Sequence, residues 1–151
     1  MLYLDSSVLV KRYLREAGSD AVNARFDQEE RIFTSWLSYA EVLAAVARKY
    51  RDGHIDRQEH ERVQRRFLEE FALSVNVLEV DGKTMSALPT LLEEFPIRSA
   101  DAVHLSSALW LRDMTRLVPQ FAQGDRTLEF GTGDRRLEVF ARGSGLAVFS
   151  P

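Results

Sequence analysis

Short apolar runs alternate with longer segments of helical periodicity along the 151-residue chain, and this alternation limits its fold more than any other feature. Each apolar run is only a few residues long, which suits a strand better than a helix. Neighbouring parallel strands need a crossover connection, which the helical segments between them would supply. The pattern therefore predicts an α/β fold with a mostly parallel central sheet, whose strands lie at 2–4, 31–34, 74–80, 127–132 and 146–149.

The helical segments are separated by breaks that particular residues mark. Pro89 is expected to kink or split the segment that contains it, because proline cannot donate a backbone hydrogen bond. Ser99 is a good N-cap for the segment that follows it. Pro119 and Gly124 indicate a loop over 113–126. The predicted helices span 8–14, 20–26, 36–50, 57–72, 83–95, 100–112 and 134–141.

The bulk composition excludes several chemistries. The chain has no cysteine, which rules out disulfides, zinc–thiolate sites and thiol catalysis. A net charge of -3 argues against a passive nucleic-acid binder, but not against a nuclease whose acidic side chains wait for metal ions. No segment approaches the roughly 20 apolar residues of a membrane span, and the first residues do not resemble a signal peptide. We therefore expect a cytoplasmic protein with one domain over 1–151 and no membrane partner.

Acidic residues follow two of the predicted strands. Asp5 comes directly after the first strand, and Asp134 lies just past the strand that ends at 132. Open α/β sheets bind ligands in the crevice outside the carboxyl ends of their strands. Asp101 lies in the first turn of its predicted helix, where the helix dipole favours a carboxylate and where the helix faces the same edge of the sheet. These three acids are therefore expected to share one crevice.

Glu41 is an acid in a mostly apolar helical stretch, so it needs a partner. Each acid also has a purely structural interpretation. Asp5 and Asp134 could cap the helices that follow them, Asp101 could serve only the helix dipole, and Ser38 with Glu41 matches a capping box. Taken together, however, acids at one edge would repel each other unless hard cations such as Mg²⁺ bind there. The joint pattern favours metal-dependent phosphodiester hydrolysis.

Four sequence blocks resemble the motifs of PIN-domain proteins, especially the VapC toxins of bacterial and archaeal toxin–antitoxin pairs. Residues 2–11 (LYLDSSVLVK) are similar to the opening motif, and residues 34–42 to the second. Residues 98–109 (RSADAVHLSSAL) resemble the third and most specific motif, and residues 130–137 resemble the closing block. The blocks occur in the family's order and cover nearly the whole chain.

The resemblance implies a PIN-like fold, with helices on both faces of the sheet, and an endoribonuclease that depends on Mg²⁺ or Mn²⁺. It also implies an RNA substrate (transfer, ribosomal or messenger RNA), a homodimer, and inhibition by a VapB-like antitoxin. It makes Asp5, Glu41 and Asp101 the core metal-binding acids, with Asp134 as the fourth. Asp125 is a rival for the fourth position, because the segment before it is longer than in many family members.

Five further residues flank these acids. Ser6 and Thr132 could contact water, metal or phosphate, although helix capping and turn stabilisation explain them equally well. Arg98 and Arg135 could bind the RNA backbone or be solvated surface charges. His104 lies one turn after Asp101 and could be a base or a phosphate contact, but a buried structural histidine is the simpler interpretation.

Two other functions use the same features. A phosphatase or a structure-specific DNA nuclease would employ similar acids, and a degenerate PIN domain would bind RNA or protein without catalysis. The two long helices at 36–50 and 57–72 could also form an arm whose apolar groove receives an antitoxin helix.

Overall fold

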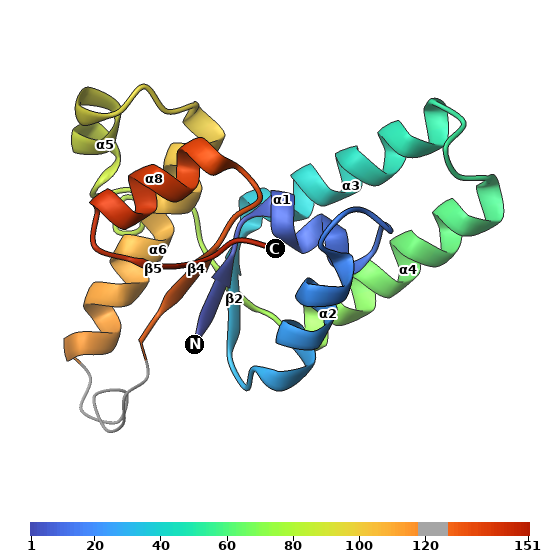
Figure 1. The fold of residues 1–151 in the computed structure, drawn as a ribbon, viewed down its shortest axis with the longest axis horizontal. Coiled ribbons are helices and arrows are strands. Elements are labelled where there is room, and N and C mark those ends of the chain that lie inside the picture. The colour runs from blue at the N-terminus through green and yellow to red at the C-terminus, as the bar shows by residue number, and fades with distance from the viewer. Residues whose placement is uncertain (118–126) are drawn as a thin grey trace.

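A computed structural model describes residues 1–117 and 127–151 of the chain. In these ranges the strands β1 to β5 form one sheet in the order β3-β2-β1-β4-β5, and every neighbouring pair is parallel. The predicted α/β fold with a parallel central sheet is confirmed (Figure 1). The strands are β1 (Leu2–Leu4), β2 (Ile32–Ser35), β3 (Asn76–Leu78), β4 (Glu129–Gly131) and β5 (Ala147–Phe149).

Helices cover both faces of this sheet (Figure 1). One layer holds α1 (Ser6–Leu9), the 3-10 turn η1 (Val10–Arg12), α2 (Ser19–Gln28), α3 (Trp36–Arg51) and α4 (Arg57–Leu73). The other layer holds α5 (Leu88–Glu94), α6 (Ser99–Leu117) and α8 (Arg135–Gly143). No helix in the described ranges is long and apolar enough to cross a membrane.

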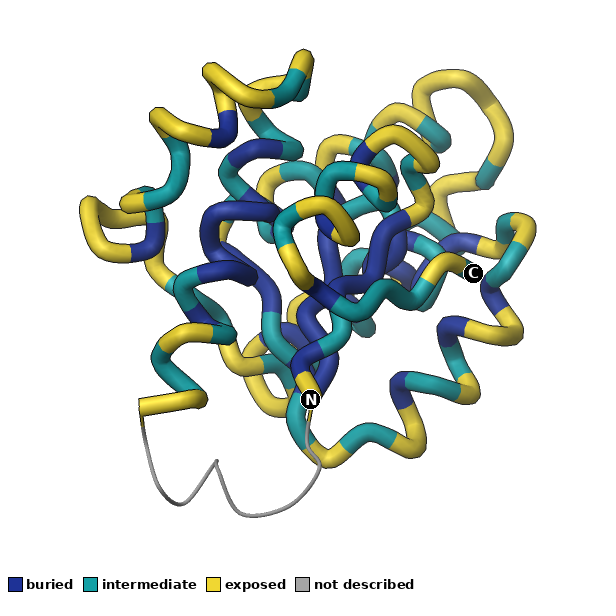
Figure 2. Tube along the Cα trace, turned by 60° about the vertical axis from the view of Figure 1, so that its left-hand side comes forward, coloured by how far each residue is buried: buried dark blue, intermediate teal, exposed yellow. Residues whose placement is uncertain are grey.

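The two layers follow from the alternation of side chains along each strand. In β1, Leu2 and Leu4 pack against the first layer, whereas Tyr3 between them packs against the second. Figure 2 shows the buried strands at the centre, with exposed residues on the outer turns of the helices. The first core includes Phe67, whose ring lies 5.2 Å from that of Tyr13 and 5.2 Å from that of Phe71. The ring of Tyr39 on α3 lies 5.9 Å from that of Phe67 and 5.3 Å from that of Phe71. These contacts anchor α4 beside α3, and the pair projects from the sheet as an arm (Figure 1).

Several predicted boundaries are wrong, each for a local reason. Pro89 stands in the first turn of α5 and helps to start it, while residues 82–87 form turns, so the predicted helix at 83–95 is shortened rather than kinked. Ser99 is inside α6, because the carbonyl of Arg98 already accepts the first helical hydrogen bond, from Ala102 N.

The loop expected over 113–126 begins later than predicted. Helix α6 continues to Leu117, with Met114 and Thr115 partly buried and the Thr115 hydroxyl donating to the carbonyl of Arg112. Residues 118–126 lie outside the described part of the chain, as does Asp125, the rival fourth acid. The strand expected over 74–80 is confined to Asn76–Leu78, and the helix expected over 8–14 is α1 followed by η1.

Candidate active site

Asp5 lies at the carboxyl end of β1, and its side chain is only 3% exposed. Its backbone N–H donates to the carbonyl of Gly131 at 3.0 Å, which fixes it beside β4. One carboxylate oxygen, Oδ1, accepts from Val8 N at 3.0 Å and from the Ser7 hydroxyl at 2.7 Å. Burial raises the pKa of Asp5, although the charge of His104 and the hydrogen bonds work against the rise. Asp5 is therefore the N-cap of α1 and also a carboxylate held in a poorly solvated position.

Asp134 lies at the end of the neighbouring strand. Its Oδ1 accepts from Arg136 N at 2.7 Å and Leu137 N at 3.3 Å, so it caps α8 as the structural interpretation expected. Its own N–H donates to the hydroxyl of Thr132, a fully buried residue. Thr132 thus supports the turn that carries Asp134.

Two glycines allow β4 and the following turn to approach β1 and α1 closely. A Cβ on Gly131 would lie 2.5 Å from Leu4 Cδ2, and one on Gly133 would lie 3.2 Å from the Ser7 hydroxyl oxygen. Instead, Gly133 N donates to that hydroxyl at 2.8 Å. Ser7 therefore joins the Asp5 carboxylate to the turn before Asp134, a role that sequence reasoning missed.

Asp101 lies in the first turn of α6 and is half-buried. Burial raises its pKa, and the negative charges of Asp134 and Asp5 raise it further, while Arg98 opposes the rise. Asp5 and Asp134 are therefore both close enough to repel Asp101, as expected for acids at one edge of a parallel sheet.

Glu41 is brought to the same region by a different partner. Its Oε2 lies 3.0 Å from Nε2 of His104. This hydrogen bond lowers the pKa of Glu41 in spite of its partial burial, and Ser6 adds a smaller effect in the same direction.

The capping-box interpretation of Glu41 is wrong. Helix α3 begins at Trp36, with Ser35 as its N-cap accepting from Leu37 N. Ser38 is instead fully buried and exchanges a 2.6 Å hydrogen bond with Thr34. Glu41 therefore has no role in starting its helix.

His104 is 1% exposed and has a partner at each ring nitrogen, Glu41 at Nε2 and the Tyr3 hydroxyl at Nδ1. This agrees with the expectation of a buried histidine with a hydrogen-bond partner. Sequence reasoning did not identify Tyr3 as a polar partner of His104. The sequence signal for its polar contact is weak, namely that a tyrosine in a central strand needs a partner for its hydroxyl.

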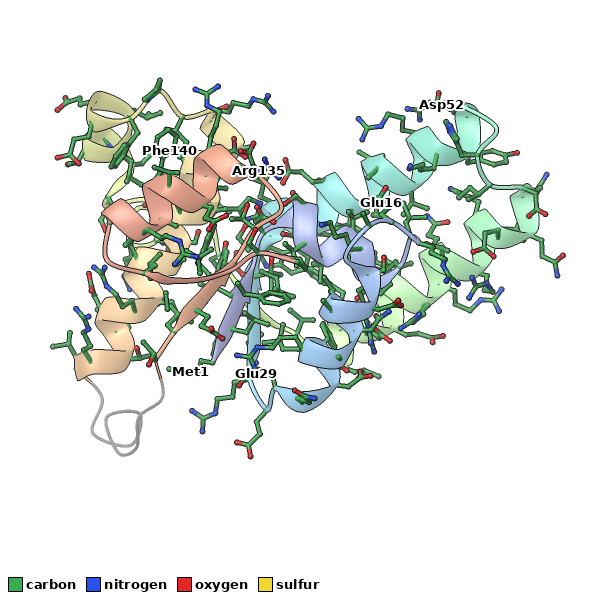
Figure 3. The ribbon with its side chains drawn as sticks, viewed as in Figure 1. Met1, Glu16, Glu29, Asp52, Arg135 and Phe140 are labelled. Carbon is green, nitrogen blue, oxygen red and sulfur yellow. The ribbon has the colours of Figure 1, made fainter. Side chains whose placement is uncertain are left out.

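Exposed arginines surround the acids. Arg98 and Arg136 line a small recess with Asp101 and Asp134, and Arg136 donates to the carbonyl of Pro96. Arg135 is exposed at the start of α8, at the opposite end of the molecule from Met1 (Figure 3). The rim of the acidic region is therefore basic, which suits a polyanionic ligand.

The donor set at this edge consists of carboxylate and hydroxyl oxygens, which suit a hard cation. In the described ranges, no three acidic or histidine side chains converge as they stand on one point where they could hold a metal ion. Mg²⁺ does not need such a cage, because it commonly binds through one or two carboxylates and keeps several waters. A cation would offset the repulsion that half-buried Asp101 experiences from two other acids, so the residues fit a Mg²⁺ or Mn²⁺ ion.

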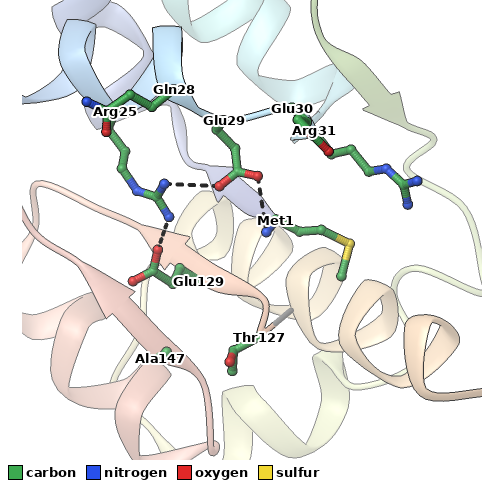
Figure 4. Close-up of a pocket in the computed structure, with 9 residues that line it drawn as sticks. All are labelled: Met1, Arg25, Gln28, Glu29, Glu30, Arg31, Thr127, Glu129 and Ala147. Carbon is green, nitrogen blue, oxygen red and sulfur yellow. Dashed lines mark hydrogen bonds and ion pairs between the residues drawn. The ribbon is translucent and has the colours of Figure 1, made fainter. Parts of the chain in front are cut away.

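A pocket of about 450 Å³ lies at the opposite, amino ends of the strands (Figure 4). Its charges neutralise one another. Glu29 pairs with the Met1 amino group at 3.3 Å and with Arg25 at 3.0 Å, and Arg25 also pairs with Glu129. This pocket is not continuous with the acidic edge, because Met1 and Asp5 are at opposite ends of β1.

Comparison with known proteins identifies relatives along nearly the whole chain. A model of the PIN domain matches residues 2–115. Ribonuclease VapC45 of Mycobacterium tuberculosis (strain CDC 1551 / Oshkosh) is 31% identical over 148 residues, which cover 98% of this chain and 94% of that protein. Ribonuclease VapC46 of Mycobacterium tuberculosis (strain ATCC 25618 / H37Rv) is 32% identical over 152 residues, with 99% and 97% covered.

Solved structures share the fold at lower identity. A chain of FitAcB from Neisseria gonorrhoeae has a TM-score of 0.66 at 18% identity, with 100% of this chain and 98% of that chain covered. A chain of VapBC2 from Rickettsia felis, in a structure bound to a DNA fragment from the VapBC2 promoter, has a TM-score of 0.65 at 15% identity. The match covers 100% of this chain and 99% of that chain.

Proposed function

The chain belongs to the PIN-domain family, and from this premise we propose that it is a metal-dependent endoribonuclease of the VapC type. The observation that carries the proposal is the gathering of Asp5, Asp101 and Asp134 at the carboxyl edge of the sheet, where burial and the charges of Asp134 and Asp5 raise the pKa of half-buried Asp101. An acid held in such surroundings is costly to the fold, and groups of this kind gather where a protein binds or reacts. The ribonuclease names of relatives that match almost the full chain support RNA as the substrate.

In this proposal Asp5, Asp101, Asp134 and Glu41 hold one or two Mg²⁺ or Mn²⁺ ions, directly or through water. When bound, such an ion supplies an activated water at neutral pH and stabilises charge at the phosphate. The protein keeps its acids in place with main-chain N–H groups, since Asp5 and Asp134 each accept hydrogen bonds from a helix N-terminus through one oxygen. Their second carboxylate oxygens would then contact the ion, directly or through water.

Substrate binding would use the basic rim. Arg98 and Arg135 are exposed beside the acids and would contact backbone phosphates on either side of the cleaved bond. Contacts of this kind are salt-dependent and read little sequence. Ser6 would assist Glu41, with which it already interacts, and Thr132 would support both the turn before Asp134 and the carboxylate of Asp5.

Two protein partners belong to the same proposal, a VapB-like antitoxin and a second copy of the chain. Exposed large apolar side chains are present on both helical layers, including Leu73 on α4 and Val139 on α8. Such residues are costly to leave in water and are common at interfaces. The arm formed by α3 and α4 is the part of the first layer that stands clear of the sheet (Figure 1).

RNA cleavage by the purified protein tests the enzymatic proposal. Total RNA, single-stranded DNA and a small phosphate ester are each incubated with the protein in Mg²⁺ or in EDTA. Asp5→Asn and Asp101→Asn are compared with Asp52→Asn, which alters an exposed acid at the end of α3. We expect Mg²⁺-dependent cleavage of RNA by the unaltered protein and by the control, and none by the two site variants.

The other outcomes select other functions. Cleavage in EDTA or by both site variants would contradict the mechanism. Hydrolysis of DNA or of the small ester without RNA cleavage would favour the DNA nuclease or the phosphatase. Binding of transfer, ribosomal or messenger RNA without cleavage of any of them would favour a degenerate PIN domain acting as a binding module.

A further inference from the structure

Three side chains from three elements form a continuous hydrogen-bonded chain beneath the acidic edge. The Tyr3 hydroxyl, from β1, lies 3.0 Å from Nδ1 of His104 on α6. Nε2 of the same ring lies 3.0 Å from Glu41 Oε2 on α3. This series of hydrogen bonds therefore links the two helical layers across the edge of the sheet, because α3 and α6 cover opposite faces.

Tyr3, at the buried end of this hydrogen-bonded series, is held firmly in place. Tyr3 is fully buried, and its ring stacks on Phe130 with centroids 5.7 Å apart and planes within 13°. Burial raises the pKa of Tyr3, so its hydroxyl keeps its proton and can donate to Nδ1. A carboxylate only accepts hydrogen bonds, so Nε2 carries the proton that faces Glu41. With both nitrogens engaged, His104 has no free nitrogen with which to act as a base.

Glu41, at the other end of the hydrogen-bonded series, is partly open to solvent, because its side chain is 32% exposed. Water could satisfy a carboxylate with that exposure, so the fold gains little from the bond. What the bond does determine is where the carboxylate sits. A glutamate side chain has several rotamers that lead into solvent, and fixing it costs conformational entropy. In the metal-free protein the His104 contact already holds the Glu41 side chain in one position, so a binding ion does not have to order it.

We propose that His104 is a positioning residue, held by Tyr3, which fixes one oxygen of Glu41 and leaves the other oriented for the cation. This inference rests on the proposed metal-dependent function and deepens it. Hydrogen bonds to a ligating carboxylate from groups behind it orient the ligand, and their loss commonly weakens metal binding 10- to 100-fold. The role differs from the base or phosphate contact that the sequence left open for His104.

Binding of Mn²⁺ to the protein alone, measured by calorimetry without RNA, tests this role. His104→Leu fills the buried space but has no donor, and we expect its Mn²⁺ affinity to fall by about 10- to 100-fold. His104→Gln can place an amide N–H toward Glu41 and should recover most of that affinity. Tyr3→Phe keeps the ring stack and removes only the hydroxyl, so it should give a smaller loss.

A double variant shows whether His104 acts through Glu41. Glu41→Gln alone should weaken Mn²⁺ binding, and adding His104→Leu should weaken it no further, because the partner that His104 positions is already gone. A further loss in the double variant would overturn the inference. Circular dichroism checks that each variant is folded. If His104→Leu does not fold, Tyr3→Phe is the deciding variant. Unchanged Mn²⁺ affinity in Tyr3→Phe would then contradict the positioning role of His104.

The outcomes separate this inference from the function on which it rests. If the unaltered protein binds no Mn²⁺, the proposed metal site fails, and the positioning role fails with it. If the unaltered protein binds Mn²⁺ and folded His104→Leu binds it equally well, the positioning role alone fails. If leucine and glutamine at 104 lower the melting temperature but leave the Mn²⁺ affinity unchanged, His104 is only structural.

Discussion

The Asp5→Asn variant should be more stable than the unaltered protein when no metal is present. Asp5 is 3% exposed, and burial raises its pKa, so its surroundings disfavour the charged form of the side chain. Asparagine has the same shape and caps a helix as well as aspartate, so the hydrogen bonds from Val8 and Ser7 to Oδ1 survive the change. The variant therefore removes the charge and keeps the local structure.

The expected gain follows from the cost of leaving a buried polar group imperfectly paired, about 1–3 kcal/mol. For a chain of this length, about 1 kcal/mol corresponds to a shift of roughly 2–4 °C in melting temperature. We therefore expect Asp5→Asn to melt roughly 2–12 °C above the unaltered protein at pH 7 in EDTA. An exposed control, Asp52→Asn, should stay within about 0.5 kcal/mol of the unaltered protein.

The stability of the unaltered protein should change with pH in a definite direction. The folded pKa of Asp5 is above its ordinary value of 3.8, so the folded state binds more protons than the unfolded state between the two values. The unaltered protein therefore loses stability as the pH rises through that interval. Because asparagine does not titrate, the advantage of Asp5→Asn should vanish near pH 3.8 and grow as the pH rises.

Differential scanning calorimetry in EDTA and in Mn²⁺ measures both effects. A hundredfold excess of Mn²⁺ over its dissociation constant should stabilise the unaltered protein by about 2.7 kcal/mol, and Asp5→Asn by much less. The two melting temperatures should therefore approach each other, or cross, when Mn²⁺ is added. Equal or lower stability of Asp5→Asn at pH 7 in EDTA would mean that the charge of Asp5 does not destabilise the fold.

Three further predictions concern neighbouring residues. Gly131→Ala places a Cβ against the buried Leu4 side chain and should cost about 1–3 kcal/mol in urea unfolding. Asp134→Ala should lose about 1 kcal/mol with the α8 cap while Asp134→Asn keeps it, yet both should cleave RNA poorly. Burial alone would raise the pKa of Glu70, but hydrogen bonds from Arg12 and a second arginine lower it overall. Its contribution to stability should therefore be lost as the pH falls below about 4.5, and the difference from Glu70→Gln should shrink there.

The sequence was sufficient to predict the sheet, because buried parallel strands are recognised by short apolar runs between helices. The positions of β1, β3, β4 and β5 all fall within the predicted runs, and β2 ends one residue beyond its run, at Ser35. Boundaries were harder to predict where one residue type serves two purposes. Pro89 breaks a helix interior but also suits a first turn, and the segment after Arg112, expected to be a loop, is helical as far as Leu117.

The acids were identified from their positions, but their partners could not be. Strand ends and a helix N-terminus place Asp5, Asp134 and Asp101 at one edge without any knowledge of packing. The contact between Glu41 and His104 joins residues 63 positions apart on helices from opposite layers, and no local pattern encodes it. The capping-box pattern was misleading for the same reason, because Ser35 caps the helix three residues earlier.

Anomalous diffraction at the manganese absorption edge, from crystals soaked in Mn²⁺, would show whether the acids at the carboxyl edge of the sheet bind a divalent cation. We expect an anomalous peak about 2.1 Å from carboxylate oxygens of Asp5 and Asp101, with Glu41 still bonded to His104. A peak at the amino-end pocket beside Glu29, or none at the acidic edge in crystals that hold Mn²⁺ elsewhere, would contradict it.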